Sequence, residues 1–148
     1  MLLHVLSFTK RDSEAFRTKA AQVCADLYLE AFGPALPVTP QLIFQTRIQH
    51  LIWIEDDERQ PVAATMVAMR SKQDYRIMGV AVASKRMGHG TALMRKIEEI
   101  LPQGARLELG VDTGKDSTEW LQRWYERLGC ETERDAGYEI VMVKRNKK

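Results

Sequence analysis

The sequence predicts an α/β (α+β) protein with a central mixed, mostly antiparallel sheet and helices on both faces. Two helical patterns follow the first strand-like segment, residues 2–8. A three-strand meander with short polar turns comes next, and after residue 82 strands and helices alternate. A meander joined to a strand–loop–helix–strand unit requires strands of both directions, with helices packed on either side.

Two helices are expected between the first strand and the meander. Asp12 is expected to cap the first, because its carboxylate can accept from the free amides of the first turn. Apolar residues then recur at helical spacing over 16–31, and Gly33 before Pro34 ends the pattern. Thr39 before Pro40 starts a second, short helix that is expected to reach about Ile48.

The remaining elements follow from alternation, caps and breakers. Strands are expected over residues 2–8, 51–55, 62–69, 75–82, 106–111, 130–133 and 138–143. A helix over 88–101 is ended by Pro102, and another runs from a cap at Asp116 or Ser117 to about residue 128. The basic tail 144–148 is expected to be frayed.

Composition excludes several classes of protein. The 148 residues, 45% hydrophobic and 28% charged, predict a single domain over 1–148. The near-balanced net charge of +2 does not favour a nucleic-acid binder, and no apolar run is long enough for a membrane span. Cys24 and Cys130 are too few for a disulfide scaffold or a zinc site, so a reducing cytoplasmic setting without a metal is expected, with a homodimer as the default assembly.

The segment from Lys85 to Thr91 has the features of an anion site. It lies between a strand and a helix, and glycines at 88 and 90 allow a tight turn. The unpaired amides and the positive dipole end of the new helix favour phosphate, and Lys85 and Arg86 add two positive charges at its mouth.

This stretch resembles the acetyl-CoA signature of the GCN5-related N-acetyltransferases, [Gln/Arg]-x-x-Gly-x-[Gly/Ala]. Lys85, Gly88 and Gly90 occupy the three defining positions, with Lys85 in place of the usual Gln or Arg. The segment 124–130 is similar to the family's aromatic-Tyr-x-x-x-Gly-Phe ending of the next helix, and the element order matches along nearly the whole chain. The family's fold, a mixed mostly antiparallel sheet with helices on both faces, is therefore expected.

The resemblance implies how acetyl-CoA, the expected co-substrate, is held. Amides from Met87 to Thr91 would bind the pyrophosphate, the backbone of Val80 and Val82 would bind the pantetheine arm, and Thr118 stands where many members have an Asn that faces the cofactor. The implied cofactor-binding residues are Val80, Val82, Lys85, Arg86, Met87, Gly88, His89, Gly90, Thr91 and Thr118.

The resemblance also implies catalytic roles. Tyr125 would protonate the leaving thiolate, or hydrogen-bond it, while a deprotonated amine attacks the acetyl carbonyl directly, in a ternary complex. Members with a catalytic Glu on the fourth strand would place it near Arg76, which is no base at neutral pH. Glu108 and Asp74 are the candidates for the base, unless proton removal proceeds through water.

The expected acceptor is a primary amine of a small molecule or a peptide, with no nucleic acid and no membrane as partner. Two alternatives stay open. The chain could be a CoA-binding sensor or degenerate homologue without turnover, as the missing fourth-strand carboxylate and Thr118 indicate. It could also be a phosphate- or nucleotide-binding module that does not use CoA.

Overall fold

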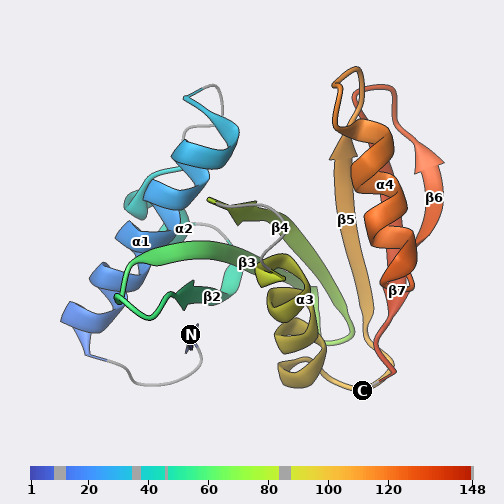
Figure 1. The fold of residues 1–148 in the computed structure, drawn as a ribbon. Helices are drawn as coiled ribbons and strands as arrows, with labels where there is room; N and C mark the ends of the chain where they lie inside the picture. The colour runs from blue at the N-terminus through green and yellow to red at the C-terminus, as the bar shows by residue number, and fades with distance from the viewer. Residues whose placement is uncertain (9–12, 35–37, 46, 84–87, 148) are drawn as a thin grey trace.

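The computed structural model describes residues 1–8, 13–34, 38–45, 47–83 and 88–147, with only the backbone for 44 and 45. The chain forms seven strands and four helices within these ranges (Figure 1). The strands are β1 (Leu2–Ser7), β2 (Ile48–Glu55), β3 (Pro61–Ser71), β4 (Asp74–Val82), β5 (Arg106–Asp112), β6 (Glu131–Asp135) and β7 (Glu139–Arg145). The helices are α1 (Glu14–Phe32), α2 (Pro40–Gln45), α3 (His89–Ile100) and α4 (Thr118–Arg127).

All seven strands form one sheet in the order β1-β2-β3-β4-β5-β7-β6. Every neighbouring pair is antiparallel except β4 and β5, which run parallel. The crossover from β4 to β5 contains α3, as a parallel connection requires. The expected mixed, mostly antiparallel sheet is confirmed.

Alternation along β2 shows that the sheet has two buried faces. Ile52 and Ile54 belong to the hydrophobic cluster that also contains residues of α3 and Tyr125 of α4. Leu51 and Trp53 belong to the other cluster, which contains the buried residues of α1. Because successive strand residues point to opposite faces, α1 and α3 cover opposite sides of the meander (Figure 1).

Two helix boundaries differ from the sequence expectation. The side chain of Ser13, rather than Asp12, caps α1 by accepting from the amide of Phe16 at 3.2 Å, and Asp12 lies outside the described residues. The second helix begins after Thr39 as expected but ends at Gln45, and Ile48 already belongs to β2. Ile48 pairs with Ala68 and is buried, so tertiary pairing outweighs the local helical pattern.

The expectation of a frayed tail from residue 144 is wrong through Asn146. Lys144 lies in β7 and donates to Glu98 at 2.5 Å. The Asn146 side-chain amide is 1% exposed and donates to the carbonyls of Glu98, Leu101 and Pro102, which are end-of-helix groups without helical partners. These contacts tie the last strand to the end of α3. In the part of the chain that the structure describes, no helix has the length and apolarity to cross a membrane.

Candidate active site

The gap between β4 and β5 is the central feature of the site. The two strands pair only where Asp74–Arg76 lies beside Arg106–Glu108. Beyond Arg76, β4 continues to Val82 while β5 continues to Asp112, and the two diverge (Figure 1). The separation leaves one edge of β4 without strand pairing along its second half, among the described residues.

Backbone alternation determines which groups of β4 line this gap. The Ala83 amide donates to the Val62 carbonyl at 2.8 Å, so the backbone groups of residue 83 point toward β3. The backbone groups of Val80 and Val82, in the alternate phase, therefore point away from β3 and into the gap. Their predicted contact with the pantetheine arm fits this orientation.

The first turn of α3 continues the same edge of the site. Gly88 has φ +76° at the N-cap, a left-handed conformation that favours glycine, and the first helical bond runs from the Ala92 amide to the Gly88 carbonyl. The amides of His89, Gly90 and Thr91 thus have no partner within the helix, as anion binding requires. Lys85, Arg86 and Met87, also predicted to bind the cofactor, lie outside the described residues.

Two further features lie in this turn. A Cβ on Gly90 would come within 3.0 Å of the Trp124 ring, so a glycine here permits the close approach of α3 and α4. The Nδ1 atom of His89 is buried and has no hydrogen-bond partner among the described residues, which leaves a polar group available to a ligand at the helix start.

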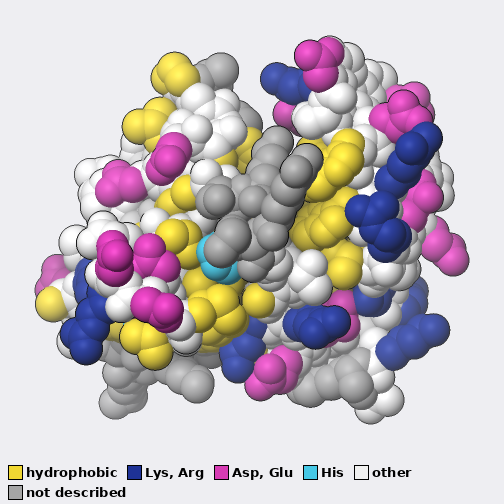
Figure 2. All heavy atoms as spheres, in the orientation of Figure 1, with side chains coloured by type: hydrophobic (Ala, Val, Ile, Leu, Met, Phe, Trp, Pro, Cys, Tyr) yellow, Lys and Arg dark blue, Asp and Glu magenta, His cyan; other side chains and the backbone are white. Residues whose placement is uncertain are grey.

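Tyr125 projects from α4 into the cluster between the sheet and the two helices and is 5% exposed. Burial, with a smaller contribution from Cys130, raises the pKa of its phenol above the usual range. Its hydroxyl has no hydrogen-bond partner among the described residues. Figure 2 shows hydrophobic side chains over the side of α4 nearer to β4. Leu121 and Trp124 of α4 are half-buried and pack against the same core cluster. Tyr125 therefore offers a neutral, uncommitted proton donor.

Glu108 does not have the environment of a general base. It is 1% exposed and accepts from Arg76 at 2.6 Å and from Arg70 at 2.8 Å, with Arg106 at 3.2 Å. Burial alone would raise the pKa of Glu108, but the hydrogen bonds from Arg76 and Arg70 outweigh burial and lower it to about 2. A carboxylate so acidic is a poor proton acceptor at neutral pH, so these surroundings favour an ion-pair role for Glu108 over the predicted role of base.

Two other predicted side chains, Asp74 and Thr118, also have partners within the protein. Asp74 accepts from Arg106 at 3.3 Å, at the paired end of β4 rather than at the gap. Thr118 donates from its hydroxyl to the Asp112 carbonyl at 2.7 Å and accepts from the Lys115 amide at 3.1 Å. Both oxygens are engaged within the protein, and Thr118 closes the turn that precedes α4.

Arg76 extends the ion pairs across β5 to β7. One of its guanidinium nitrogens donates to both carboxylate oxygens of Glu139 at 2.9 Å, and the other donates to Glu108. The Glu139 carboxylate lies over Gly110, where a Cβ would come within 2.4 Å of it. The absence of a side chain at 110 is thus a condition for the contact between Arg76 and Glu139.

Gly110→Ala is expected to destabilise the protein by about 1–3 kcal/mol, because the added methyl displaces a carboxylate that Arg76 holds in place. Urea unfolding measures the loss. In a Glu139→Ala background the same change should cost less, because the clash is absent. An equal cost in both backgrounds would contradict this explanation.

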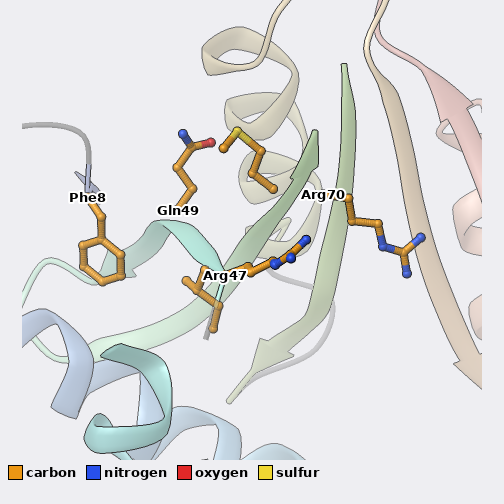
Figure 3. Close-up of a pocket in the computed structure, with 6 residues that line it drawn as sticks. Phe8, Arg47, Gln49 and Arg70 are labelled. Carbon is orange, nitrogen blue, oxygen red and sulfur yellow. The ribbon is translucent and has the colours of Figure 1, made fainter. Parts of the chain in front are cut away.

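A separate hollow of about 440 Å³ lies at the other end of the strands. It is lined by Phe8, Arg47, Ile48, Gln49, Met69 and Arg70. Figure 3 shows Phe8 and Gln49 on one side and Arg70 pointing away from them. Met69 pairs with Tyr75 at the start of β4, so this hollow is remote from the gap and contains none of the predicted site residues.

Sequence reasoning missed the residues that shape β4. Tyr28 of α1 and Thr65 of β3 both donate to the carbonyl of Gly79. A signal for this was present, since a glycine inside a strand pattern indicates a bulge. Nothing local indicates that a residue 51 positions earlier reaches that carbonyl.

Comparisons with known proteins agree with this geometry. A family model described as the acetyltransferase (GNAT) family matches residues 21–130. No curated protein sequence matches the chain significantly. Among solved structures, the aminoglycoside 6'-N-acetyltransferase from Enterococcus faecium superposes with a TM-score of 0.71 at 15% identity, covering 100% of this chain and 98% of that one.

Two further structures have the same fold. The histone acetyltransferase HPA2 and related acetyltransferase from Corynebacterium glutamicum gives a TM-score of 0.69 at 16% identity, covering 100% of this chain and 98% of that one. Tetrahymena GCN5 gives 0.65 at 11% identity, covering 99% and 96%. At these identities the structures establish the fold, while the family match spans more than half of the sequence. The chain therefore belongs to the GNAT family of acetyl-CoA-dependent N-acetyltransferases.

Proposed function

We propose that this acetyltransferase moves the acetyl group of acetyl-CoA to a primary amine of a small molecule or a peptide by direct attack in a ternary complex. The observation that carries the proposal is the gap between β4 and β5, with the backbone groups of Val80 and Val82 pointing into it. An extended thioester arm can use such a free strand edge as a missing strand would.

The residues around the gap have separate roles in this proposal. The free amides of His89, Gly90 and Thr91 at the start of α3 would bind the pyrophosphate, together with Lys85, Arg86 and Met87. Val80 and Val82 would hold the pantetheine arm. Tyr125, whose burial raises its pKa and keeps it neutral, would donate a proton to the departing thiolate.

Neither carboxylate predicted as the base is free to remove the amine's proton. Glu108 is held by three arginines and Asp74 by Arg106. We propose that water accepts the proton. Water is sufficient where part of the acceptor amine is already deprotonated. Positioning and electrostatic stabilisation then supply most of the acceleration.

The engagement of Glu108 and Asp74 in ion pairs also favours the sensor alternative. With Arg76 in place of a fourth-strand carboxylate and Glu108 engaged, the chain could bind CoA without turnover. This alternative shares the cofactor site with the enzyme and differs only in the chemical step.

One experiment separates the candidates. The protein is incubated with acetyl-CoA and a panel of amines, including polyamines, aminoglycosides, amino acids and short peptides, and free thiol is measured. Amine-dependent thiol release is the expected result. Stabilisation by CoA in a thermal-shift assay without thiol release from any amine would favour the sensor. Stabilisation by ATP or NAD but not by CoA would overturn both proposals.

The proposal includes a cytoplasmic setting, a single domain and a homodimer as expected assembly. Cys24 and Cys130 are both free and buried, which suits a reducing compartment. Burial raises the pKa of the Cys24 thiol to about 12. Burial, with a smaller contribution from Glu98, raises the pKa of the Cys130 thiol to about 11. Neither cysteine is therefore a reactive thiolate at neutral pH.

A further inference from the structure

The pairing of β3 with β4 is interrupted opposite the gap. Thr65 pairs with Val80 and Val67 pairs with Ile77, so Met66 alone lies opposite two residues of β4. This β-bulge contains Gly79, whose φ of +90° lies in the left-handed region. The bulge lies in the unpaired half of β4, next to the groups that face the gap.

The hydroxyl of Tyr28 fills the interruption. It accepts from the Met66 amide at 3.1 Å and donates to the Gly79 carbonyl at 2.9 Å. Tyr28 is 3% exposed, and burial, with smaller effects from Cys24 and Tyr125, raises its pKa, so it stays a neutral donor. A side chain from α1 thereby replaces a bond of the strand ladder.

Thr65 holds the same oxygen from the other face of the sheet. Its hydroxyl donates to the Gly79 carbonyl at 2.7 Å, and the residue is fully buried. Ala64 and Met66, its neighbours on β3, belong to the cluster under α1, so the Thr65 side chain points to the opposite face. Two donors on two elements therefore fix the direction of one carbonyl.

This arrangement has a consequence for catalysis. The peptide unit is planar and trans, so the Val80 amide N–H points opposite to the Gly79 carbonyl, away from β3 and into the gap. We propose that Tyr28 and Thr65 are positioning residues that hold this N–H as a hydrogen-bond donor to the thioester carbonyl of acetyl-CoA. The inference rests on the proposed acetyl transfer, in which charge develops on that carbonyl oxygen.

Three substitutions test it. Tyr28→Phe removes both hydroxyl bonds, and Thr65→Val removes one donor while conserving shape; Thr65→Ser retains the donor. Tyr75→Phe is the control, because it deletes the hydroxyl of another buried tyrosine, which donates to the Lys72 carbonyl, away from the bulge. We expect kcat to fall about tenfold in Tyr28→Phe and Thr65→Val, with the KM for acetyl-CoA nearly unchanged, and expect Thr65→Ser and Tyr75→Phe to stay near wild type.

A second readout does not depend on turnover. Infrared spectra of acetyl-CoA labelled with ¹³C at the carbonyl, bound without amine, report the hydrogen bond directly. The bound carbonyl band should shift to higher frequency in Thr65→Val and return to its wild-type frequency in Thr65→Ser. This shift does not require acetyl transfer, so it would still be observed if the proposed amine acetylation failed. Thermal unfolding shows whether each variant folds. If Tyr28→Phe does not fold, the comparison of Thr65→Val with Thr65→Ser tests the proposal. Unchanged kcat and band position in folded Thr65→Val would overturn the proposal.

Discussion

Tyr125→Phe is expected to lower kcat for acetyl transfer about a hundredfold, the lower end of the range for losing a general acid. The phenol is buried, and burial raises its pKa, so it carries its proton throughout the working pH range. Its hydroxyl has no partner among the described residues, so the donor is free for the departing thiolate. Phenylalanine keeps the packing against Trp124, whose ring centroid lies 4.8 Å away.

Single-turnover thiol release measures the expected loss in the chemical step, and the affinity for acetyl-CoA measures the effect on binding. The affinity for acetyl-CoA should change little, because the proton is needed only when the thioester bond breaks. Tyr75→Phe is again the control, as its hydroxyl lies at the start of β4. A Tyr125→Phe protein with wild-type kcat would assign the residue to packing alone.

Glu108→Gln is expected to destabilise the folded protein by about 3 kcal/mol at neutral pH. The pKa of the folded carboxyl is lowered to about 2, because hydrogen bonds from Arg76 and Arg70 outweigh the effect of burial. Glutamine keeps the shape but not the charge, and leaves the guanidinium groups of three arginines short of one buried counter-charge.

The pH dependence of this loss has a definite sign. In the unfolded chain Glu108 titrates near its ordinary pKa of about 4.3, so the contribution is fully present above about pH 5. It is lost as the pH falls toward the folded pKa, about 2. The stability difference between wild type and Glu108→Gln should therefore shrink between about pH 5 and pH 3.

Urea unfolding at a series of pH values measures this difference. Glu58→Gln is the control, since Glu58 is an exposed residue of the turn between β2 and β3. It should leave stability within about 0.5 kcal/mol of wild type. A Glu108→Gln protein as stable as wild type, with an altered pH profile of kcat, would instead restore Glu108 as the base.

The charged network around Glu108 lies where the two halves of the sheet join. Arg76 on β4 holds Glu108 on β5 and Glu139 on β7, and Arg106 joins Asp74 to Glu133. These pairs surround the last residues at which β4 and β5 are paired. The network thereby fastens the point from which the two strands diverge, and the gap proposed to hold the thioester arm begins there.

The sequence by itself determined the order of elements and predicted the place of the candidate anion site. Alternating apolar residues, proline and glycine breakers and the glycines at 88 and 90 act over a few residues, so local chemistry is sufficient to read them. The start of α3, where the structure has free amides and a left-handed Gly88, follows from such a local pattern.

Only the tertiary structure decided the surroundings of the carboxylates and the shape of β4. Glu108 has an isolated strand position in the sequence, and its three arginines come from β3, β4 and its own strand. Tyr28 reaches Gly79 across 51 residues of chain. A pKa and the direction of a peptide group depend on which distant groups lie within a few ångströms, and that is set by packing rather than by neighbours in the chain.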